Sequence, residues 1–269
     1  GNRGAGMLEN ALFCAAVGGQ DRIGFTAAGA GFPFTLSVPF ATDRPIATQN
    51  LDLLRAAGLQ VASRRVRVRV ASEDREWARS FLGWRGGALI AVHPFAHREG
   101  RFRAWPLEHY AALTTALSSW EGVRILLLGG SADRYILRSL KNARPGRVLD
   151  AVGRTSLGQT AALLEAADLF VGNDSGLLHL ALALGRPAVG IFGSTSPDQV
   201  IGLDADCVPV CTAVELPCLP CYRHQPFFEI KCAHISCLRT LPVERVLGAI
   251  MQRLSGPTSS PVPPLQVAR

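Results

Sequence analysis

Apolar positions come in short uninterrupted runs from residue 88 onward, and segments with helical spacing separate these runs. The runs predict buried strands at Ala88–Val92, Val123–Leu128, Arg147–Leu149, Leu169–Val171 and Ala188–Phe192. The segments between them predict helices at Pro106–Leu117, Ser131–Leu140, Leu157–Ala166 and Leu177–Leu184. Apolar strands that alternate with helices are typical of a parallel sheet covered on both faces, so this region predicts an α/β fold.

The first 87 residues have a weaker pattern. Helical spacing predicts helices at Ala5–Val17, Gln49–Ala57 and Ser72–Leu82. A short strand is expected at Arg22–Phe25, and the alternation of Arg and Val over Arg65–Val70 predicts a strand with one solvated face. Glycine and proline between Gly29 and Pro45 predict a loop.

The segment Gly83–Gly87 predicts a joint between two lobes. We therefore expect a partial N-terminal lobe over residues 1–84 and a Rossmann-like domain over residues 85–254. Proline and glycine are frequent after residue 254, which predicts that residues 255–269 form a disordered tail.

The polar turn Gly172–Gly176 is the strongest candidate for a ligand site. It lies between a strand and a helix, and such a helix aims its free backbone N–H groups at the carboxyl edge of the sheet. Glycines allow a ligand to approach the backbone, so we expect a phosphate or diphosphate here. The turn is not a G-x-S-x-G elbow, because Asp174 stands at the nucleophile position, and no G-K-[ST] follows it as in a P-loop.

Asp174, Ser175, Gly176 and His179 are the candidate binding residues of this turn. Asp174 has an ordinary structural alternative as the cap of the following helix. His179 lies one turn into that helix, where it can face the same ligand while the neighbouring leucines face the core. A lone histidine on an apolar helix is more often a core residue, but its place beside the turn favours a binding role.

Two further loops, His93–Trp105 and Gly129–Asp133, are expected to reach the same edge of the sheet. The first carries Arg98, Arg101 and Arg103, and a guanidinium can bind a diphosphate through two parallel hydrogen bonds. A solvated basic loop is the alternative interpretation of these arginines.

Composition narrows the class of partner. The chain has 269 residues, 48% of them hydrophobic, which suits one large α/β domain or two smaller lobes. The net charge of +7 favours anionic partners, whereas the lack of an aromatic and basic cluster disfavours nucleic acid. No apolar run is long enough to span a bilayer, and the poor match to a signal peptide favours the cytosol.

The order of motifs resembles a known family. His-Pro-x-Ala after an apolar strand leads to Trp-Pro, and Leu-Leu-Leu-Gly-Gly-x-x-Asp follows. Next come Asn-Asp-Ser-Gly-x-x-His-x-Ala, a proline six residues on, and a Cys-x-Pro-Cys segment that leads to Cys-Leu. Over about residues 1–247, and most specifically over Phe170–Pro187, this order resembles glycosyltransferase family 9, the ADP-heptose:lipopolysaccharide heptosyltransferases and their relatives.

The resemblance implies a GT-B fold, with a Rossmann-like parallel sheet domain preceded by an incomplete second Rossmann-like lobe. It implies that the C-terminal lobe holds the nucleotide-sugar donor. The donor-binding residues that it implies are Ala96, His97, Arg103, Asp133, Asp174, Ser175, Gly176, His179, Ser194 and Thr195. Arg103 stands where many members have Lys, and His97 replaces a Ser or Thr.

The implied activity is inverting transfer of a heptose or related sugar from ADP-heptose, or a similar nucleotide sugar, to a lipopolysaccharide-core acceptor without a cofactor. Arg103 and Asp174 are the expected catalytic residues, and the Arg103 guanidinium together with the helix N-terminus at Gly176 would stabilise the leaving diphosphate. The family's presumed general base lies in a Gly-Asp turn near its start, and we expect that base to be absent from this chain. The implied partners are the nucleotide sugar and an anionic glycolipid, with transient contact at the cytoplasmic surface of the inner membrane and no nucleic acid.

Two other functions stay open. A nucleotide-sugar epimerase or hydrolase would need an acid–base pair within this chain, for which His93 and Asp174 are the candidates. A non-catalytic nucleotide-sugar-binding fragment or partner subunit is the other alternative.

The seven cysteines give a weaker hypothesis. Their odd number argues against a disulfide framework, and no metal is the default expectation. Cys218, Cys221, Cys232 and Cys237 could bind structural zinc, although the second pair is more widely spaced than zinc knuckles usually are. Reduced buried thiols are the alternative.

Overall fold

The computed structural model describes residues 12–26, 34–41, 44–61, 63, 66–83, 86–95, 102–140, 143–202, 205–221, 232 and 234–255. The chain divides into two compact units. The larger unit takes its residues from 67–194, 205–217 and 233–269, and the smaller from 1–66, 195–204 and 218–232. The predicted lobes 1–84 and 85–254 stay a prediction, and residues 256–269 of the predicted tail lie outside the described residues.

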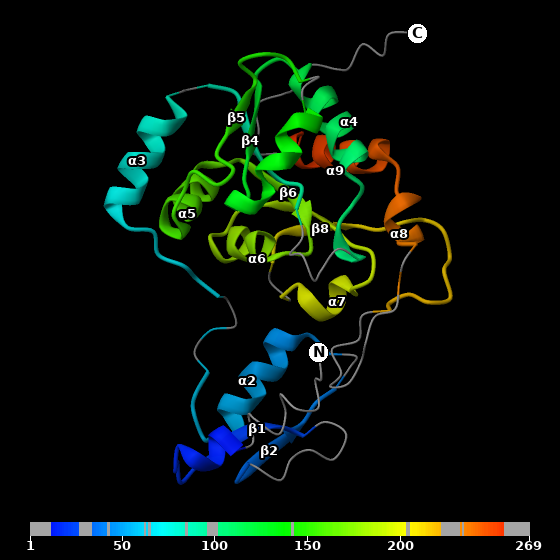
Figure 1. Cartoon of the computed structure of the whole chain (residues 1–269). Helices are drawn as coiled ribbons and strands as arrows, with labels where there is room; N and C mark the ends of the chain where they lie inside the picture. Colours follow the sequence, from blue (N-terminus) through cyan, green and yellow to red (C-terminus); the bar gives the residue numbers. More distant parts are fainter. Residues whose placement is uncertain are drawn as a thin grey trace. The chain divides into compact units, whose positions relative to one another are not determined.

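A parallel sheet of six strands forms the centre of the larger unit (Figure 1). Its strands are β3 (Ala88–His93), β4 (Val123–Leu127), β5 (Val148–Asp150), β6 (Leu169–Asn173), β7 (Ala188–Ile191) and β8 (Cys207–Val210). They lie in the order β5-β4-β3-β6-β7-β8, and every neighbouring pair is parallel. This is the doubly wound order of a Rossmann sheet, so the predicted α/β class is confirmed.

The strand order reverses between β3 and β6, because β4 and β5 lie on one side of β3 whereas β7 and β8 lie beyond β6. Doubly wound sheets bind ligands outside the carboxyl ends of the strands at such a reversal. The topology therefore places the ends of β3 and β6 where a site is expected.

Helices cover both faces of the sheet (Figure 1). One layer contains α3 (Ser72–Leu82), α5 (Leu157–Ala166) and α6 (Gly176–Ala183), and the other contains α4 (Leu107–Ser118) and α9 (Val243–Leu254). Within the first layer α5 packs against α3 and α6, and in the second α4 packs against α9. The buried strands between these layers are apolar at nearly every position, because neither face of the sheet meets solvent.

Two predicted elements differ from the structure, and three observed elements of the larger unit were not predicted. The segment Ser131–Leu140 is a 3-10 helix rather than an α-helix. The alternating segment from Val66 to Val70 pairs with no strand in the described part of the chain, and Val66 is 67% exposed. Alternation predicts two faces, but a strand also needs a neighbour, and the described sheet ends at β5 and β8. Sequence patterns also missed β8, α9 and the short α8 (Ser236–Arg239).

The smaller unit contains a two-stranded parallel sheet, β1 (Ile23–Thr26) and β2 (Leu36–Pro39), with α2 (Ile46–Ala56) and the short α7 (Pro197–Val200). Residues 12–16 are also helical. The strand β2 corrects the prediction of a loop over residues 29–45. Its four residues pair with β1 although glycine and proline surround them, so backbone pairing prevailed over composition.

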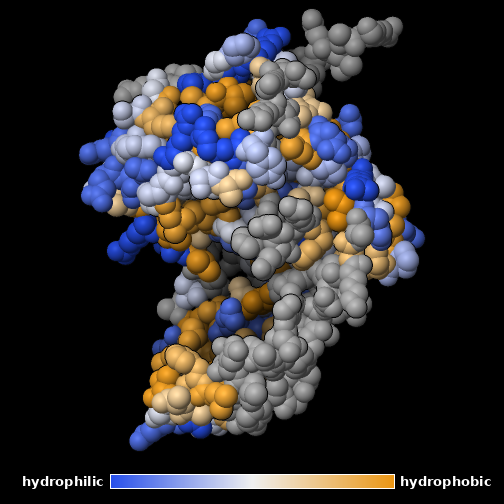
Figure 2. Space-filling model, in the orientation of Figure 1, coloured by the Kyte–Doolittle hydropathy of each residue, from blue (hydrophilic) through white to orange (hydrophobic). Residues whose placement is uncertain are grey.

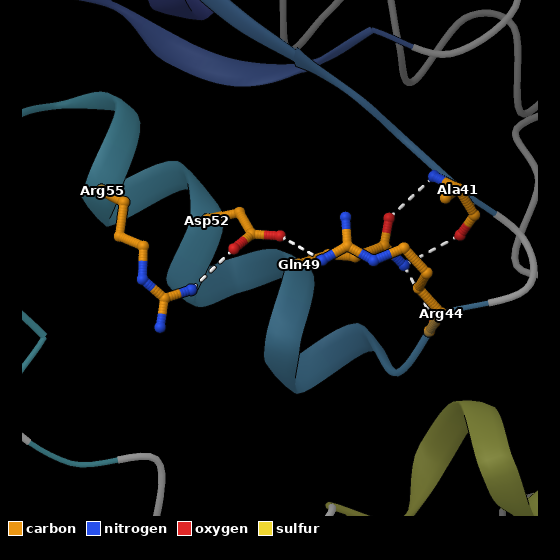
Figure 3. Close-up of polar contacts among 5 residues, drawn as sticks. All are labelled: Ala41, Arg44, Gln49, Asp52 and Arg55. Carbon is orange, nitrogen blue, oxygen red and sulfur yellow. Dashed lines mark hydrogen bonds and ion pairs between the residues drawn. The ribbon is translucent and has the colours of Figure 1, made fainter.

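Gln49 fixes the entry to α2 (Figure 3). Its side chain is 1% exposed, donates to the carbonyl oxygens of Ala41 and Arg44, and accepts from the Ala41 N–H at 2.7 Å. One turn further on, Asp52 lies between Arg44 and Arg55, and the hydrogen bond from Arg44 lowers the pKa of Asp52. The amide therefore satisfies buried backbone groups before the helix begins.

The described residues of the smaller unit contribute no buried apolar side chain. Leu12, Phe13 and Val17 are each more than half exposed, and hydrophobic colour gathers on the visible face of this unit in Figure 2. The larger unit, by contrast, has a continuous apolar core around its sheet.

Candidate functional site

The carboxyl ends of β3 and β6 meet at the reversal of strand order. His93, the last residue of β3, pairs with Gly172 of β6. A Cβ atom on Gly172 would lie 3.0 Å from the His93 carbonyl oxygen and 2.8 Å from the Phe170 ring, so only glycine fits without movement. Close approach of the two strands brings His93 beside the polar turn that follows β6.

The helix α6 begins at Gly176 directly after this turn, and its first turn is open. Ser175 is its N-cap, with φ −152° and ψ 166°, but the Ser175 side chain makes no capping hydrogen bond. Gly176 is exposed, and a Cβ atom there would meet nothing within 4 Å. The first N–H groups of a helix have no partner within the helix and carry its positive partial charge, so this end can bind an anion.

Asp174 links the side chains of Arg103 and His179, both predicted for the site. Its carboxylate accepts from Nη1 of Arg103 and lies within reach of Nε2 of His179, both at 3.3 Å. Asp174 is 5% exposed, whereas the side chains of Arg103 and His179 are 28% and 45% exposed. The structural alternative of Asp174 as a helix cap is wrong, because Ser175 occupies the N-cap. The carboxylate instead orients two groups that are accessible to a ligand.

Arg103 has a second contact that helps to fix it. Its guanidinium carbon lies 5.6 Å from the centre of the Phe102 ring, within the range of a cation–π interaction. An arginine held by a carboxylate and a ring loses less side-chain entropy when it binds a phosphate.

Asn173 anchors both ends of the loop that carries Arg103. Its Oδ1 accepts from the Trp105 N–H and the Tyr110 hydroxyl, each at 3.0 Å, and its Nδ2 donates to the Phe95 carbonyl at 3.3 Å. Asn173 is fully buried, and burial raises the pKa of Tyr110 well above its ordinary value, so the hydroxyl remains a donor. Sequence reasoning missed this role; the signal was an amide at the end of an apolar strand, where an unpaired polar group would be costly.

His93 is buried beside Ser175. Its side chain is 9% exposed, and Nδ1 lies 3.1 Å from Ser175 Oγ. Burial lowers the pKa of His93 to about 4, so the ring is neutral at pH 7. The sequence suggested His93 only as an acid–base candidate of the alternative enzymes, and its contact with Ser175 could not be foreseen because 82 residues separate the two.

Asp133 uses its carboxylate within its own turn. Oδ2 accepts from the Gly130 N–H at 2.8 Å, at the start of the 3-10 helix. The adjacent Gly129 lets the Phe95 ring pack closely, because a Cβ atom there would lie 2.5 Å from it. The predicted contact of Asp133 with a ribose stays a prediction.

Of the four remaining predicted residues, the structure describes two. Ser194 and Thr195 are buried, and their hydroxyls have no hydrogen-bond partner within the described part of the chain. Ser194 follows β7 in the larger unit, whereas Thr195 belongs to the smaller unit. Ala96 and His97 lie outside the described residues.

The cysteines do not form a metal site in the part of the chain that the structure describes. No three His, Cys, Asp or Glu side chains are grouped there so that they could hold a metal ion. Cys237 is buried but Cys218 is exposed, so the expectation of buried thiols applies to only part of the set. Among the described helices, none is long and apolar enough to cross a bilayer.

A family model described as glycosyltransferase family 9 (heptosyltransferase) matches residues 4–231. Lipopolysaccharide heptosyltransferase 2 of Salmonella typhimurium is 38% identical over 103 residues, which are 37% of this chain and 29% of that protein. Lipooligosaccharide heptosyltransferase 2 of Haemophilus ducreyi is 30% identical over 145 residues, 52% of this chain and 41% of that protein. The matched segments thus span less than half the length of these curated relatives.

Solved structures show the same fold. ADP-heptose lipopolysaccharide heptosyltransferase II of E. coli has a TM-score of 0.68 at 21% identity, over 91% of this chain and 73% of its own. E. coli heptosyltransferase WaaC, solved with ADP-2-deoxy-2-fluoro heptose, has a TM-score of 0.52 at 21% identity, over 83% of this chain and 60% of its own. The fold class implied by the motif resemblance is therefore confirmed.

Proposed function

The chain belongs to glycosyltransferase family 9, and we propose that its larger unit binds the ADP-sugar donor of a heptosyl transfer. One observation carries the proposal: Asp174 holds Arg103 and His179 beside the uncapped first turn of α6. The fluoro-heptose donor bound to the WaaC relative supports the choice of an ADP-heptose-type ligand.

The proposed ligand of this cluster is the diphosphate. The backbone N–H groups at the start of α6 and the Arg103 guanidinium would donate to its oxygens. Asp174 itself is nearly buried, and as an anion it would not contact the diphosphate directly. We assign Asp174 the role of orienting Arg103 and His179, and Arg103 the role of touching the leaving group.

The proposed reaction is a displacement at the anomeric carbon. The acceptor hydroxyl forms a bond to that carbon and gives its proton to a general base that is not among the residues assigned here, while the bond from the carbon to the diphosphate oxygen breaks and ADP leaves. Attack from the face opposite the leaving group inverts the configuration. Negative charge grows on the diphosphate in the transition state, so preorganised N–H donors and a guanidinium lower the barrier there. In this scheme these groups supply the positive charge without a resident metal or cofactor.

The acceptor is proposed from chemistry and from the relatives' names. A lipopolysaccharide-core glycolipid is anionic, and the chain has a net charge of +7. Transient contact with the cytoplasmic face of the inner membrane would give access to such an acceptor.

ADP binding tests the donor site directly. Calorimetric titration of the whole chain with ADP should give a measurable dissociation constant, and Arg103→Ala should weaken it by about tenfold or more because one charge-assisted contact is lost. Arg75→Ala is the matched control, since Arg75 is likewise paired with a carboxylate, but with Glu165 rather than Asp174. A folded wild-type chain that does not bind ADP would refute the proposal.

Hydrolysis of a nucleotide sugar is a second candidate function, favoured by one observation. The neutral His93 lies 3.1 Å from the Ser175 hydroxyl, the geometry of a nucleophile and its base. Release of free heptose from ADP-heptose without any acceptor, lost in Ser175→Ala, would support hydrolysis. Transfer to an acceptor without such release would exclude it.

A further inference from the structure

His93 is a buried titratable side chain that the proposed transfer does not use. It ends β3, and its ring meets the Phe95 ring edge-on with 5.6 Å between ring centres. Its Nδ1 lies 3.1 Å from Ser175 Oγ, and this contact holds whichever of the two atoms carries the proton. The question is what a buried imidazole does for a serine at the start of α6.

Ser175 is an N-cap residue whose hydroxyl does not cap. A serine at this position ordinarily accepts a hydrogen bond from the second or third N–H of its helix. Ser156, the N-cap of α5, does so by accepting from the Gln159 N–H at 3.1 Å. In α6 no such bond exists, and the Ser175 hydroxyl lies toward His93 instead.

We propose that His93 is a positioning residue that holds the Ser175 hydroxyl away from the α6 amides and thereby keeps those amides open for the donor's diphosphate. The inference rests on the proposed function of this site. Without His93, the hydroxyl would rotate onto the N–H of Leu177 or Leu178, the second and third residues of the helix. It would then compete with the phosphate oxygens for the same donors.

The environment of His93 fits a positioning role rather than direct contact with an anion. The ring is nearly buried and neutral at pH 7, so it brings no positive charge to a phosphate. Arg103 and His179, which are more accessible, face the shared carboxylate of Asp174 instead. His93 therefore acts through the serine that it contacts.

A double-mutant cycle separates this role from simple packing. In the full chain with Ser175 present, His93→Leu should weaken ADP binding by about fivefold, the factor that one N-cap hydrogen bond represents. In the Ser175→Ala background, where no hydroxyl can cap the helix, the same substitution should change ADP affinity by less than about twofold. His93→Asn places an amide near the position of Nδ1 and should restore the affinity of the wild-type chain.

Hydrogen exchange gives a readout that needs no ligand. In His93→Leu, the amides of Leu177 and Leu178 should exchange about fivefold more slowly than in the wild-type chain, because the serine now caps them. This protection should disappear in the double variant with Ser175→Ala. If His93→Leu does not fold, His93→Phe keeps a ring beside Phe95 and is expected to give the same results.

The outcomes distinguish this inference from the function on which it rests. Equal losses of ADP affinity in the two backgrounds would mean that His93 acts by packing, which overturns the inference. If the wild-type chain binds ADP and His93→Leu leaves the affinity unchanged, the inference about His93 is overturned but the proposed donor site is not. A folded wild-type chain that binds no ADP overturns the donor site and the inference together.

Discussion

The N-terminal ends of α5 and α6 have the same N-cap residue but differ in the hydrogen bonds that this residue makes. Each helix follows a strand and has serine at its N-cap with extended backbone. At α5 the capping box is complete: Ser156 accepts from the Gln159 N–H, and Gln159 Oε1 accepts from the Ser156 N–H at 3.0 Å. At α6 the Ser175 side chain makes no capping hydrogen bond, and the third helical residue is Leu178, which cannot complete a capping box.

The difference shows how one residue type can serve stability or binding. A filled cap stabilises a helix by about 1 kcal/mol, and α5 retains that gain. The sequence after Ser175 has no Glu or Gln three residues on, and His93 lies at the serine hydroxyl. The end of α6 thus gives up local stability and keeps donors that an anion can use.

The largest expected effect comes from removing the anchor that precedes α6. Asn173→Ala deletes three buried hydrogen bonds and leaves the Tyr110 hydroxyl without its partner, so the free energy of unfolding should fall by about 3 to 4 kcal/mol. Urea unfolding of the wild-type chain and the variant measures this fall in the free energy of unfolding. Tyr110→Phe is the milder control and should cost about 1 kcal/mol. Equal, small losses in both variants would contradict the anchoring role.

The pH dependence of stability should report the buried His93. Its pKa is lowered from 6.5 to about 4 in the folded chain, so the unfolded chain binds more protons between these values. The contribution of neutral His93 to the free energy of unfolding is fully present above pH 6.5. It is lost as the pH falls toward 4, and the total loss is about 3 kcal/mol. Unfolding of wild type and His93→Asn at pH 7 and pH 5 checks this, and identical pH slopes would refute it.

Asp174→Asn tests the proposed binding role of the N-terminal end of α6. The neutral amide orients Arg103 and His179 less well, so ADP affinity should fall by about tenfold. Stability should change little, because the side chains of both partners are partly solvated. Asp150→Asn is the matched control, since Asp150 also pairs with two arginines but ends β5. Similar ADP losses in both variants would remove Asp174 from the site.

The smallest effect is expected at the closed helix end. Ser156→Ala should lower the free energy of unfolding by about 1 kcal/mol and leave ADP affinity unchanged. Ser175→Ala should not destabilise the start of its helix in this way, because the Ser175 hydroxyl makes no capping bond and contacts His93 instead. A larger loss of stability in Ser175→Ala than in Ser156→Ala would contradict the claim that only Ser156 stabilises its helix by capping.

The fold of the larger unit was predictable to a useful degree. The apolar runs gave β3, β4, β6 and β7 within about two residues, because strands buried on both faces have a strong signal. The pattern failed at β8 and β2, which are four residues long and each contain a proline. It also predicted a strand at Arg65–Val70, of which the described residues 66–70 alternate in polarity but pair with no strand.

The site was predictable as a list but not as an arrangement. Arg103, Asp174 and His179 came from motif spacing, and the structure brings their side chains together. Asn173 and His93 were not assigned their roles, because each acts on residues more than 60 positions away. Asp133 was expected at the ligand, but its carboxylate has a partner in its own turn.

The sequence by itself determined the alternation of buried strands and helices, the family, and the glycine and polar residues of the turn before α6, because each is a local pattern along the chain. The tertiary structure alone decided which polar groups meet. The parallel pairing of β3 with β6 places His93 at Ser175 and the arginine loop at Asp174. Whether a serine caps its own helix depends on such a neighbour, and strand order, not sequence distance, supplies it.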